Sequence, residues 1–580
     1  MQRLWNLGNT TLRNPNRIAD GLKLFSKEFQ GRIRGEELES RFWNRLVEEG
    51  IVSSEGSEQS WGGRKWRSAF VKLGFATDKS YKVGTLKTTP KELSIQHPEL
   101  GLQGLEYEIT PAGRNLLAAN NLIGAIQDVY LRQLVRHEIP SPVESNFPPG
   151  RLKPFIFLLQ VLARLKELDQ PSINKLEIGI FLQLFRDHTE DLANITVERI
   201  LEYRRERELQ ISKTLKKQLD IRYLTQASGD GHVKKESPKD YADTTIRYSQ
   251  MSGIVTTQGA RLILREDKAE IINAILESEP NFMVQEDPLG YLADFYQGTT
   301  LPIDNLQFAR REIQRLKTSI RSYQETPQIA DENIAIYGDI QSLQRAKYTL
   351  IGQLSLLKEE KFAATQIQTD SIQDILNYLQ ALGSRRAENL EITDPPTYLE
   401  WAVWRSFLAI DSICNPIQST RRFPLDDNLH PLSTAPGGGS DMIFEFDDYV
   451  LAVEVTLTSS NRQQVAEGEP VRRHIANLRT EYPNKEIYGL FIAPSIDNNT
   501  AETFRSGVWY RGENEEYVNI VPITLDRFRQ IIGIMLKRRF SPIEFKGLLD
   551  KCLMTRNIRA PYWKNQIELE TERWIAHLNA

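Results

Sequence analysis

The spacing of apolar and polar positions divides the chain into four regions. Residues 1–139 mix helical and short strand patterns, and residues 140–298 carry apolar helical runs followed by an alternating hairpin pattern. Residues 299–390 are polar and helix-forming, whereas strand and helix patterns alternate over residues 391–580. Because 580 residues are too many for one hydrophobic core, we predict a multidomain α+β protein with these four segments as its domains.

The first region ends in a strand pattern that leads into a capped helix. Residues 105–110 resemble a short strand, Thr110 suits a helix N-cap, and Pro111 suits the first helical position. A short strand followed by a capped helix is how the wing of a winged-helix domain often ends. We therefore predict a winged-helix-like subdomain over residues 1–139.

The second region repeats that pattern after a proline-rich stretch at 140–154, which we predict to be a linker. Three apolar runs indicate helices, a fourth helix follows at 244–252, and residues 254–264 resemble a hairpin turning at Gln258-Gly259. Helix, helix and hairpin form a second winged-helix pattern. The three apolar runs lie at 155–168, 176–185 and 197–208.

The third region predicts a helical connector. Residues 300–385 combine polar positions with spaced leucines, which is typical of a helical hairpin or short bundle. Alternatively, these helices belong to a neighbouring domain.

The fourth region contains an acidic hairpin. Strand patterns at 441–446 and 449–456 are separated by Asp447-Asp448. If this pair forms a two-residue loop, the residue numbers of every cross-strand pair sum to 895. Asp441 then lies directly opposite Glu454.

Two opposed carboxylates within apolar strands indicate a bound cation. Like charges at directly opposed positions destabilise a sheet unless something neutralises them. Carboxylate oxygens in small number suit Mg²⁺, which polarises a phosphate and lowers the pKa of an attacking water. The alternative is a pair of exposed acids without function, which hairpins commonly carry.

Further candidate residues flank the hairpin. Glu400 lies in an apolar, aromatic helix and is either a solvent-facing residue or a buried acid. Glu467 follows the second strand, and Pro470 suits the start of the next helix. That helix places Arg473 and His474 near the acids, although structural roles for both stay open.

Basic residues are gathered locally although the formal net charge is −4. The first 75 residues hold 13 Lys and Arg against 9 Asp and Glu, and a second basic run spans 204–235. Such runs are candidate DNA contacts, although each member alone is more often a solvated surface charge than a base contact. The candidates are Arg64, Lys65, Arg67, Arg204, Arg205, Arg207, Lys216, Lys217 and Arg247.

Several classes of protein are excluded by motifs that are missing. Only two cysteines occur and no His-x-x-x-His spacing exists, which argues against a disulfide framework or a zinc hydrolase. No phosphate-binding Gly-x-x-x-x-Gly-Lys motif exists. The chain lacks an N-terminal signal pattern and any apolar run of about 18 residues, so we expect a cytoplasmic protein without membrane contact.

The acidic motif resembles the core of the PD-(D/E)XK nucleases. It stands here as Gly439-Ser440-Asp441 followed by Glu454-Val455-Thr456. Ser440 replaces the motif proline, and Thr456 replaces the lysine that usually orients or activates the attacking water. The resemblance implies a C-terminal α/β PD-(D/E)XK-like nuclease domain.

A narrower resemblance covers most of the chain. Residues 397–493, with the layout of the first 265 residues, are similar to the AlwI-type restriction endonucleases, a Type IIS group that includes nicking enzymes and whose site also lacks the lysine. The resemblance implies that Glu400, Asp441, Glu454 and Glu467 form the site. It also implies that Asp441, Glu454 and Glu467 hold Mg²⁺, and that Arg473 or His474 stabilises charge on the phosphate.

The implied function is restriction of foreign DNA, as in phage defence. The chain would bind a short asymmetric duplex site and cut a few bases outside it, as a nicking enzyme or with a second nuclease subunit or transient dimer. A cognate methyltransferase belongs to such a restriction–modification system. The alternative is a non-catalytic winged-helix DNA-binding protein with a degenerate nuclease domain, which the missing lysine favours.

Overall fold

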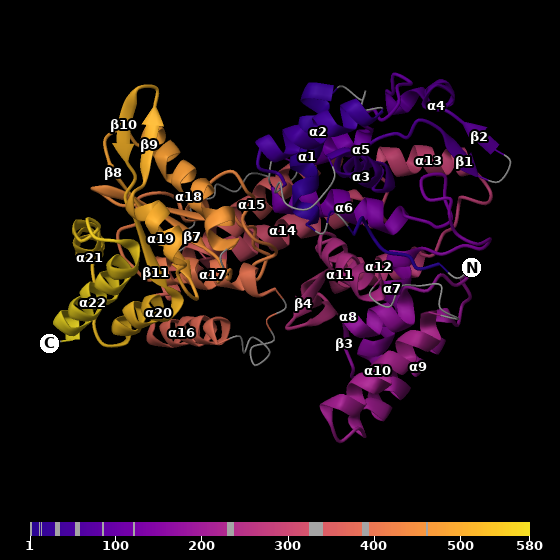
Figure 1. Ribbon diagram of the computed structural model, residues 1–580. Helices are drawn as coiled ribbons and strands as arrows, with labels where there is room; N and C mark the ends of the chain where they lie inside the picture. Colours follow the sequence, from indigo (N-terminus) through magenta and orange to yellow (C-terminus); the bar gives the residue numbers. More distant parts are fainter. Residues whose placement is uncertain are drawn as a thin grey trace. The chain divides into compact units, whose positions relative to one another are not determined.

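The computed structural model consists of two compact units (Figure 1). Unit one comprises residues 1–47 and 54–352, and unit two comprises residues 48–53 and 353–580. The structure describes residues 3–10, 12, 14–29, 35–52, 59–83, 86–119, 122–228, 237–323, 340–384, 392, 394–459 and 462–579. None of the helices within these ranges is both long enough and apolar enough to cross a membrane.

The first part of unit one is mainly helical. It contains α1 (Ile18–Leu24), α2 (Glu36–Glu48), α3 (Gln59–Lys72), β1 (Tyr81–Val83), β2 (Leu86–Thr88), α4 (Pro90–Gln96), α5 (Pro111–Ala118) and α6 (Ile123–Arg136). The start of α5 confirms the sequence prediction, because the Thr110 side chain caps it by accepting from the Gly113 N–H and Pro111 is its first residue. The predicted strand at 105–110 is wrong. Glu108 instead accepts three backbone N–H groups of residues 103–105, which folds this segment into turns.

The second part of unit one contains a three-stranded antiparallel sheet in the order β3-β5-β4. The predicted hairpin is confirmed, with its loop one position later than expected, on Gly259 and Ala260, and Gly259 takes the positive φ of 56° that the turn needs. The elements are α7 (Pro154–Glu167), β3 (Ser172–Asn174), α8 (Lys175–Glu177), the π-helix η4 (Ile178–Leu182), α9 (Leu192–Glu208), α10 (Lys213–Ser228), α11 (Ser237–Gln250), β4 (Val255–Gln258) and β5 (Arg261–Leu264).

Helices α9 and α10 form a pair, here called the helical arm, between η4 and α11 in the sequence. Tyr203 on α9 donates to Asp220 on α10 at 2.6 Å and packs edge-on against Tyr223 at 5.0 Å. Lys234 and Lys235 of the predicted basic run lie outside the described residues.

The proline-rich stretch at 140–154 lies within unit one. Backbone hydrogen bonds of 2.8 and 2.9 Å join Ile139 and Leu152 across it. Unit one continues through α12 (Ala269–Ser278), α13 (Pro288–Gln297) and α14 (Leu306–Tyr323).

The predicted connector contributes helices to both units. The C-terminal boundary between the units falls within α15 (Ile340–Thr365). Helix α14 buries Ile313 and Ile320 in unit one, and α16 (Thr369–Gly383) buries Ile375 in the core of unit two. The helices at the two ends of the predicted connector are therefore packed into the cores of the two units.

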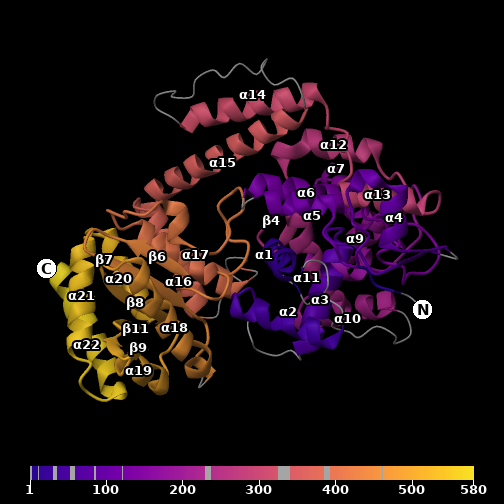
Figure 2. The ribbon, with the colours of Figure 1, turned by 90° about the horizontal axis from the view of Figure 1, so that it is seen from above.

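In unit two, helices pack around a four-stranded sheet (Figures 1 and 2). The strand order is β11-β8-β7-β6; β6 and β7 are antiparallel, and the other two pairings are parallel. Phe407 of α17 packs on Phe444 at one face, and Phe504 of α19 packs on Phe491 at the other. The elements are α17 (Pro395–Leu408), β6 (Met442–Glu445), β7 (Tyr449–Val455), α18 (Arg462–Glu481), β8 (Glu486–Ala493), α19 (Asn498–Arg505), β9 (Val508–Arg511), β10 (Asn514–Tyr517), β11 (Ile520–Thr524), α20 (Leu525–Gly533), α21 (Pro542–Met554) and α22 (Ala560–Asn579).

The acidic hairpin has the predicted register. All four cross-strand pairs, from Met442 with Val453 to Glu445 with Val450, sum to 895. The Phe446 N–H donates to the Tyr449 carbonyl at 2.9 Å, which leaves Asp447 and Asp448 as the loop. The alternation of side chains therefore places Asp441 beside Glu454 on one face of the sheet.

The predicted start of the next helix at Pro470 is wrong, because α18 begins at Arg462 and contains Pro470 in its interior. The buried Gln463 side chain fixes this earlier start. It donates to the Thr458 and Ser495 carbonyls at 2.7 and 2.9 Å and accepts from the Asp497 N–H at 2.9 Å. Glu467 consequently lies within the helix rather than before it.

Candidate active site

The centre of the site is the pair Asp441 and Glu454 at the ends of β6 and β7. An Asp441 carboxylate oxygen accepts the Val455 N–H at 2.9 Å, which fixes its side chain against the neighbouring strand. Glu454 is only 6% exposed. Two carboxyl groups are thus held next to one another in a place with little water.

Burial and the charges of neighbouring carboxylates raise the pKa values of this pair. Burial is the main cause for Asp441, whose pKa lies well above its usual range, and the Glu454 charge adds to it. Burial and then the Glu467 charge raise the pKa of Glu454 to about 8. Both groups therefore favour the protonated form until a cation neutralises them.

Glu400 joins the pair from α17, and it is a buried acid rather than a solvent-facing residue, being 6% exposed. One of its carboxylate oxygens accepts the Ala435 N–H at 2.7 Å. Its pKa is raised well above the usual range, first by burial and then by the charges of Asp441 and Glu454. The structure thus places this predicted residue within electrostatic reach of the pair.

Helix α18 brings Glu467 and His474 toward the same acids. They are seven residues apart, so they lie on one face of the helix. His474 Nδ1 lies 2.8 Å from a Glu454 carboxyl oxygen, and burial is the main cause that lowers the pKa of His474 to about 4. His474 is therefore neutral near pH 7 in the metal-free protein, and its role in stabilising charge on the phosphate stays a prediction.

Arg473 lies on the same helix and pairs with Glu469 at 3.1 Å, with its side chain 40% exposed. Its positive charge is a further cause of the lowered pKa of His474. A direct role for Arg473 at the phosphate stays a prediction.

Arg422 is a site residue that the sequence analysis missed. Its backbone N–H donates to the Asp441 carbonyl at 3.1 Å, and its charge lowers the pKa of Asp441 and of Glu454. The segment before Asp441 has neither strand alternation nor helical spacing, so no sequence signal points to this contact.

The residues present fit Mg²⁺. Among the residues that the structure describes, no three His, Cys, Asp or Glu side chains form a group that could hold a metal ion. Mg²⁺, however, is usually bound through one or two carboxylates and keeps several waters and substrate oxygens. Asp441 and Glu454 supply such a pair, and Glu467 acts on both through its charge.

In unit one, the candidate DNA contacts on α3 differ in their surroundings. Arg67 pairs with Glu39 and lies over the Tyr107 ring at 4.4 Å, so its guanidinium serves the packing of the unit. Arg64 is exposed and Lys65 is partly exposed.

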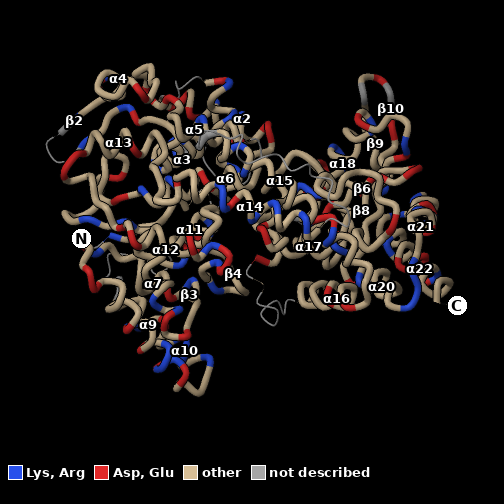
Figure 3. The backbone as a smooth tube through the Cα atoms, turned by 180° about the vertical axis from the view of Figure 1, so that it is seen from behind, with Lys and Arg blue, Asp and Glu red and all other residues tan. Residues whose placement is uncertain are grey.

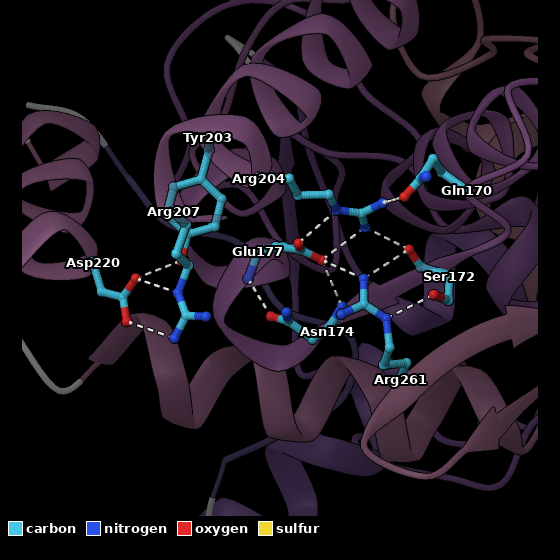
Figure 4. Close-up of polar contacts among 9 residues, drawn as sticks. All are labelled: Gln170, Ser172, Asn174, Glu177, Tyr203, Arg204, Arg207, Asp220 and Arg261. Carbon is cyan, nitrogen blue, oxygen red and sulfur yellow. Dashed lines mark hydrogen bonds and ion pairs between the residues drawn. The ribbon is translucent and has the colours of Figure 1, made fainter. Parts of the chain in front are cut away.

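Arg204 is held by a network around the buried Glu177 (Figure 4). Its guanidinium donates to both Glu177 oxygens at 2.8 and 3.0 Å and to the Ser172 carbonyl at 2.6 Å. Arg261 of β5 reaches the same carboxylate at 3.3 Å. The network joins α9 to the sheet, and contact of Arg204 with DNA stays a prediction.

The remaining basic candidates lie on the helical arm and on α11 (Figure 3). Arg207 donates to Asp220 at 2.9 Å, and Arg247 donates to Asp243 at 3.1 Å. Arg205 and Lys217 are exposed and Lys216 is partly exposed, and none of the three has an ion pair with another described residue.

Comparison with known proteins gives one family. The sequence pattern described as "AlwI restriction endonuclease" matches residues 71–531. No curated protein matches the chain.

Two solved structures are similar to parts of this chain, and both superpose on it with low TM-scores. The small subunit (R.BspD6I2) of the heterodimeric restriction endonuclease R.BspD6I is 26% identical, with a TM-score of 0.27, and the match covers 36% of this chain and 97% of that one. The BpuJ1 endonuclease binding domain, solved with pyrene- and phenanthrene-modified DNA, is 13% identical, with a TM-score of 0.30 and coverage of 51% and 97%.

Proposed function

The chain belongs to the AlwI restriction endonuclease family, whose members are DNA phosphodiester hydrolases, and we propose that it is a magnesium-dependent, Type IIS-like enzyme. It binds a short asymmetric duplex site and hydrolyses a phosphodiester bond a few bases outside it. The observation that carries the proposal is the register of the acidic hairpin. This register sets Asp441 beside Glu454, with Glu400 and His474 next to the pair.

Asp441 and Glu454 are the metal ligands in this proposal, and Glu467 and Glu400 surround them. When bound, Mg²⁺ neutralises the two carboxylates, polarises the phosphate and lowers the pKa of an attacking water. The Glu467 charge acts on both ligands and favours a divalent cation at this position, and the buried Glu400 carboxyl lies within electrostatic reach of the pair.

His474 is the proposed proton acceptor in place of the motif lysine. With Glu454 ionised, the neutral imidazole donates its Nδ1–H to that carboxylate and keeps the lone pair of Nε2 available. Among the described residues, Nε2 has no hydrogen-bond partner. A positioned base of this kind typically contributes about 10²–10⁴-fold to the rate.

Helix α11 is the proposed DNA-reading helix. The order α7, β3, α8, α11, β4 and β5, with the sheet order β3-β5-β4, supports this proposal, because it matches the topology of a winged helix with the helical arm as an insertion. In such domains the last helix enters the major groove. Lys239, Arg247 and Gln250 lie partly or fully exposed at helical spacing along α11, and Arg64 and Lys65 are candidate contacts of the first subdomain.

The test uses a supercoiled plasmid with isosteric variants of the site. Asp441→Asn and Glu454→Gln remove one charge each, and Glu445→Gln is the matched control, because Glu445 lies on the same hairpin but pairs with Lys485 at 2.9 Å. The wild type and the control should give discrete products with Mg²⁺ and none with EDTA. The site variants should shift DNA in a gel without cutting it.

Two outcomes would change the proposal. If Asp441→Asn cuts like the wild type, the hairpin is not the active site. If the wild type binds DNA but never cuts it, the non-catalytic binding function, which the absent motif lysine at Thr456 favours, takes its place.

A further inference from the structure

We propose that Arg422 binds the scissile phosphate and supplies the positive charge that Thr456 cannot. The proposal rests on the function proposed above. It assigns a catalytic role to a residue outside the acidic motif and outside the two strands that carry it.

The first argument is the position of Arg422 in the sheet. An isolated antiparallel bridge pairs Arg421 with Met442, so the next pair along the two chains is Arg422 with Asp441. Their backbones are joined by the 3.1 Å bond from the Arg422 N–H to the Asp441 carbonyl. Directly opposed residues share a face of the sheet, which places Arg422, Asp441 and Glu454 in one row.

The two neighbouring arginines have different surroundings. Arg421 is on the opposite face, where its guanidinium donates to both oxygens of the buried Glu359 at 2.8 and 2.9 Å. The described residues give Arg422 no carboxylate partner; its guanidinium donates to the Gly437 carbonyl at 3.2 Å. Its Nη1 is buried and has no hydrogen-bond partner among the described residues. A buried donor of this kind is free for an anionic ligand.

Gly439 makes room for this guanidinium. A Cβ atom built at Gly439 would lie 2.5 Å from Arg422 Nη1 and 3.0 Å from its central carbon. Unlike the neighbouring Gly438, Gly439 does not have a positive φ, so its backbone does not require glycine. Gly439 lies two residues before the catalytic Asp441. The space where its side chain would stand is therefore occupied by the guanidinium of Arg422.

The positive charge of the Arg422 guanidinium suits a phosphate ligand. Arginine presents a planar fork of donors that matches two phosphate oxygens, and it stays protonated at every working pH. The positive charge of Arg422 acts on Asp441, Glu454 and His474 alike, which shows that it lies within electrostatic range of all three.

The competing role is purely structural: Arg422 would merely offset the charge of the acids. A neutral phosphate analogue separates the two roles. The cut position is first mapped with the wild type, and then duplexes are made with either a phosphodiester or a methylphosphonate at that bond. Affinity is measured with Ca²⁺ in place of Mg²⁺ for the wild type and for Arg422→Gln.

We expect Arg422→Gln to weaken binding of the phosphodiester duplex about 10- to 100-fold, the factor for a hydrogen bond to a charged group. With the methylphosphonate, the two proteins should bind alike. An equal loss with both duplexes, or no loss with either, would overturn the proposal. Arg529→Gln is the control, because Arg529 is an arginine of α20 paired with Asp526 at 2.8 Å.

Gly439→Ala tests the same contact without changing a charge. The new methyl group must displace the guanidinium, so cleavage should fall in the same direction as in Arg422→Gln. The double variant should be no slower than Arg422→Gln alone. A Gly439→Ala protein that cleaves like the wild type would contradict the assignment, whereas cleavage by Asp441→Asn would instead reject the proposed function itself.

Discussion

Burial and the neighbouring Glu467 carboxylate both raise the pKa of Glu454. Its pKa of about 8 means that the folded, metal-free protein keeps this proton at a pH where the unfolded chain has lost it. The folded state therefore loses stability as the pH rises from the unfolded pKa, near 4.5, to about 8. Metal binding must displace the proton, which links Mg²⁺ affinity to pH.

The first prediction follows from this linkage. The apparent Mg²⁺ affinity should rise about tenfold per pH unit for each proton displaced, and the contribution of Glu454 should level off above about pH 8. The measurement is the Mg²⁺-induced rise in Tm at several pH values. Glu454→Gln mimics the protonated group, so it should be more stable than the wild type in EDTA at high pH and gain little from Mg²⁺. A wild-type response to Mg²⁺ that is flat from pH 6 to 8 would contradict the linkage.

The second prediction concerns His474. Asparagine can replace the Nδ1–H donor to Glu454 but has no counterpart of Nε2, so His474→Asn should bind Mg²⁺ and DNA normally and cleave about 10²–10⁴-fold more slowly. Single-turnover cleavage at saturating Mg²⁺ is the measurement. An unchanged rate in the variant would exclude His474 as the proton acceptor.

Among the secondary-structure elements, the Glu177 network fixes the helical arm to the sheet of unit one. Glu177 is 2% exposed and accepts from Arg204 of α9 and Arg261 of β5, while the Asn174 N–H completes the cap of α8. Removing its charge leaves two guanidinium groups without a carboxylate in a partly buried place. Such a loss is far more costly than the loss of an exposed pair.

The third prediction is that Glu177→Gln lowers the stability of unit one by about 3–5 kcal/mol. Urea unfolding, followed by hydrogen exchange of α9 and β5, is the measurement. Arg311→Ala breaks an exposed pair with Glu270 and should cost less than about 1 kcal/mol. Similar losses in both variants would show that the network does not anchor the arm.

The elements also show which features a sequence pattern can specify. The hairpin register was predictable because strand alternation and a two-residue loop leave one alignment. The start of α18 was not, because the side chain of Gln463 contacts both the preceding loop at Thr458 and a distant loop at Ser495, which overrides the local preference of Pro470. Arg422 was missed for a similar reason: its place beside Asp441 depends on one isolated bridge between segments without periodicity.

For the whole molecule, we expect DNA affinity and cleavage to depend on different units. Arg205, Lys216 and Lys217 lie on the helical arm without ion pairs to other described residues, whereas Arg204 serves the fold. The fourth prediction is that replacing these three by glutamine reduces the slope of log K against log salt by about 0.9 for each phosphate that the variant no longer neutralises. Binding isotherms at several salt concentrations measure this slope. An unchanged slope would remove the arm from the DNA interface.

The last prediction concerns the number of cuts. Within the part of the chain that the structure describes there is one acidic hairpin of this kind, and one site cuts one strand at a time. Open-circular plasmid should therefore form first, at a rate proportional to protein concentration. If a second copy cuts the other strand, linear DNA should form with a steeper concentration dependence. Added Asp441→Asn protein should then suppress linear product more than open-circular product. If linear DNA never forms, the chain is a nicking enzyme or needs a different subunit. Linear DNA that appears from the start without an open-circular intermediate, at limiting protein, would contradict the single site per chain.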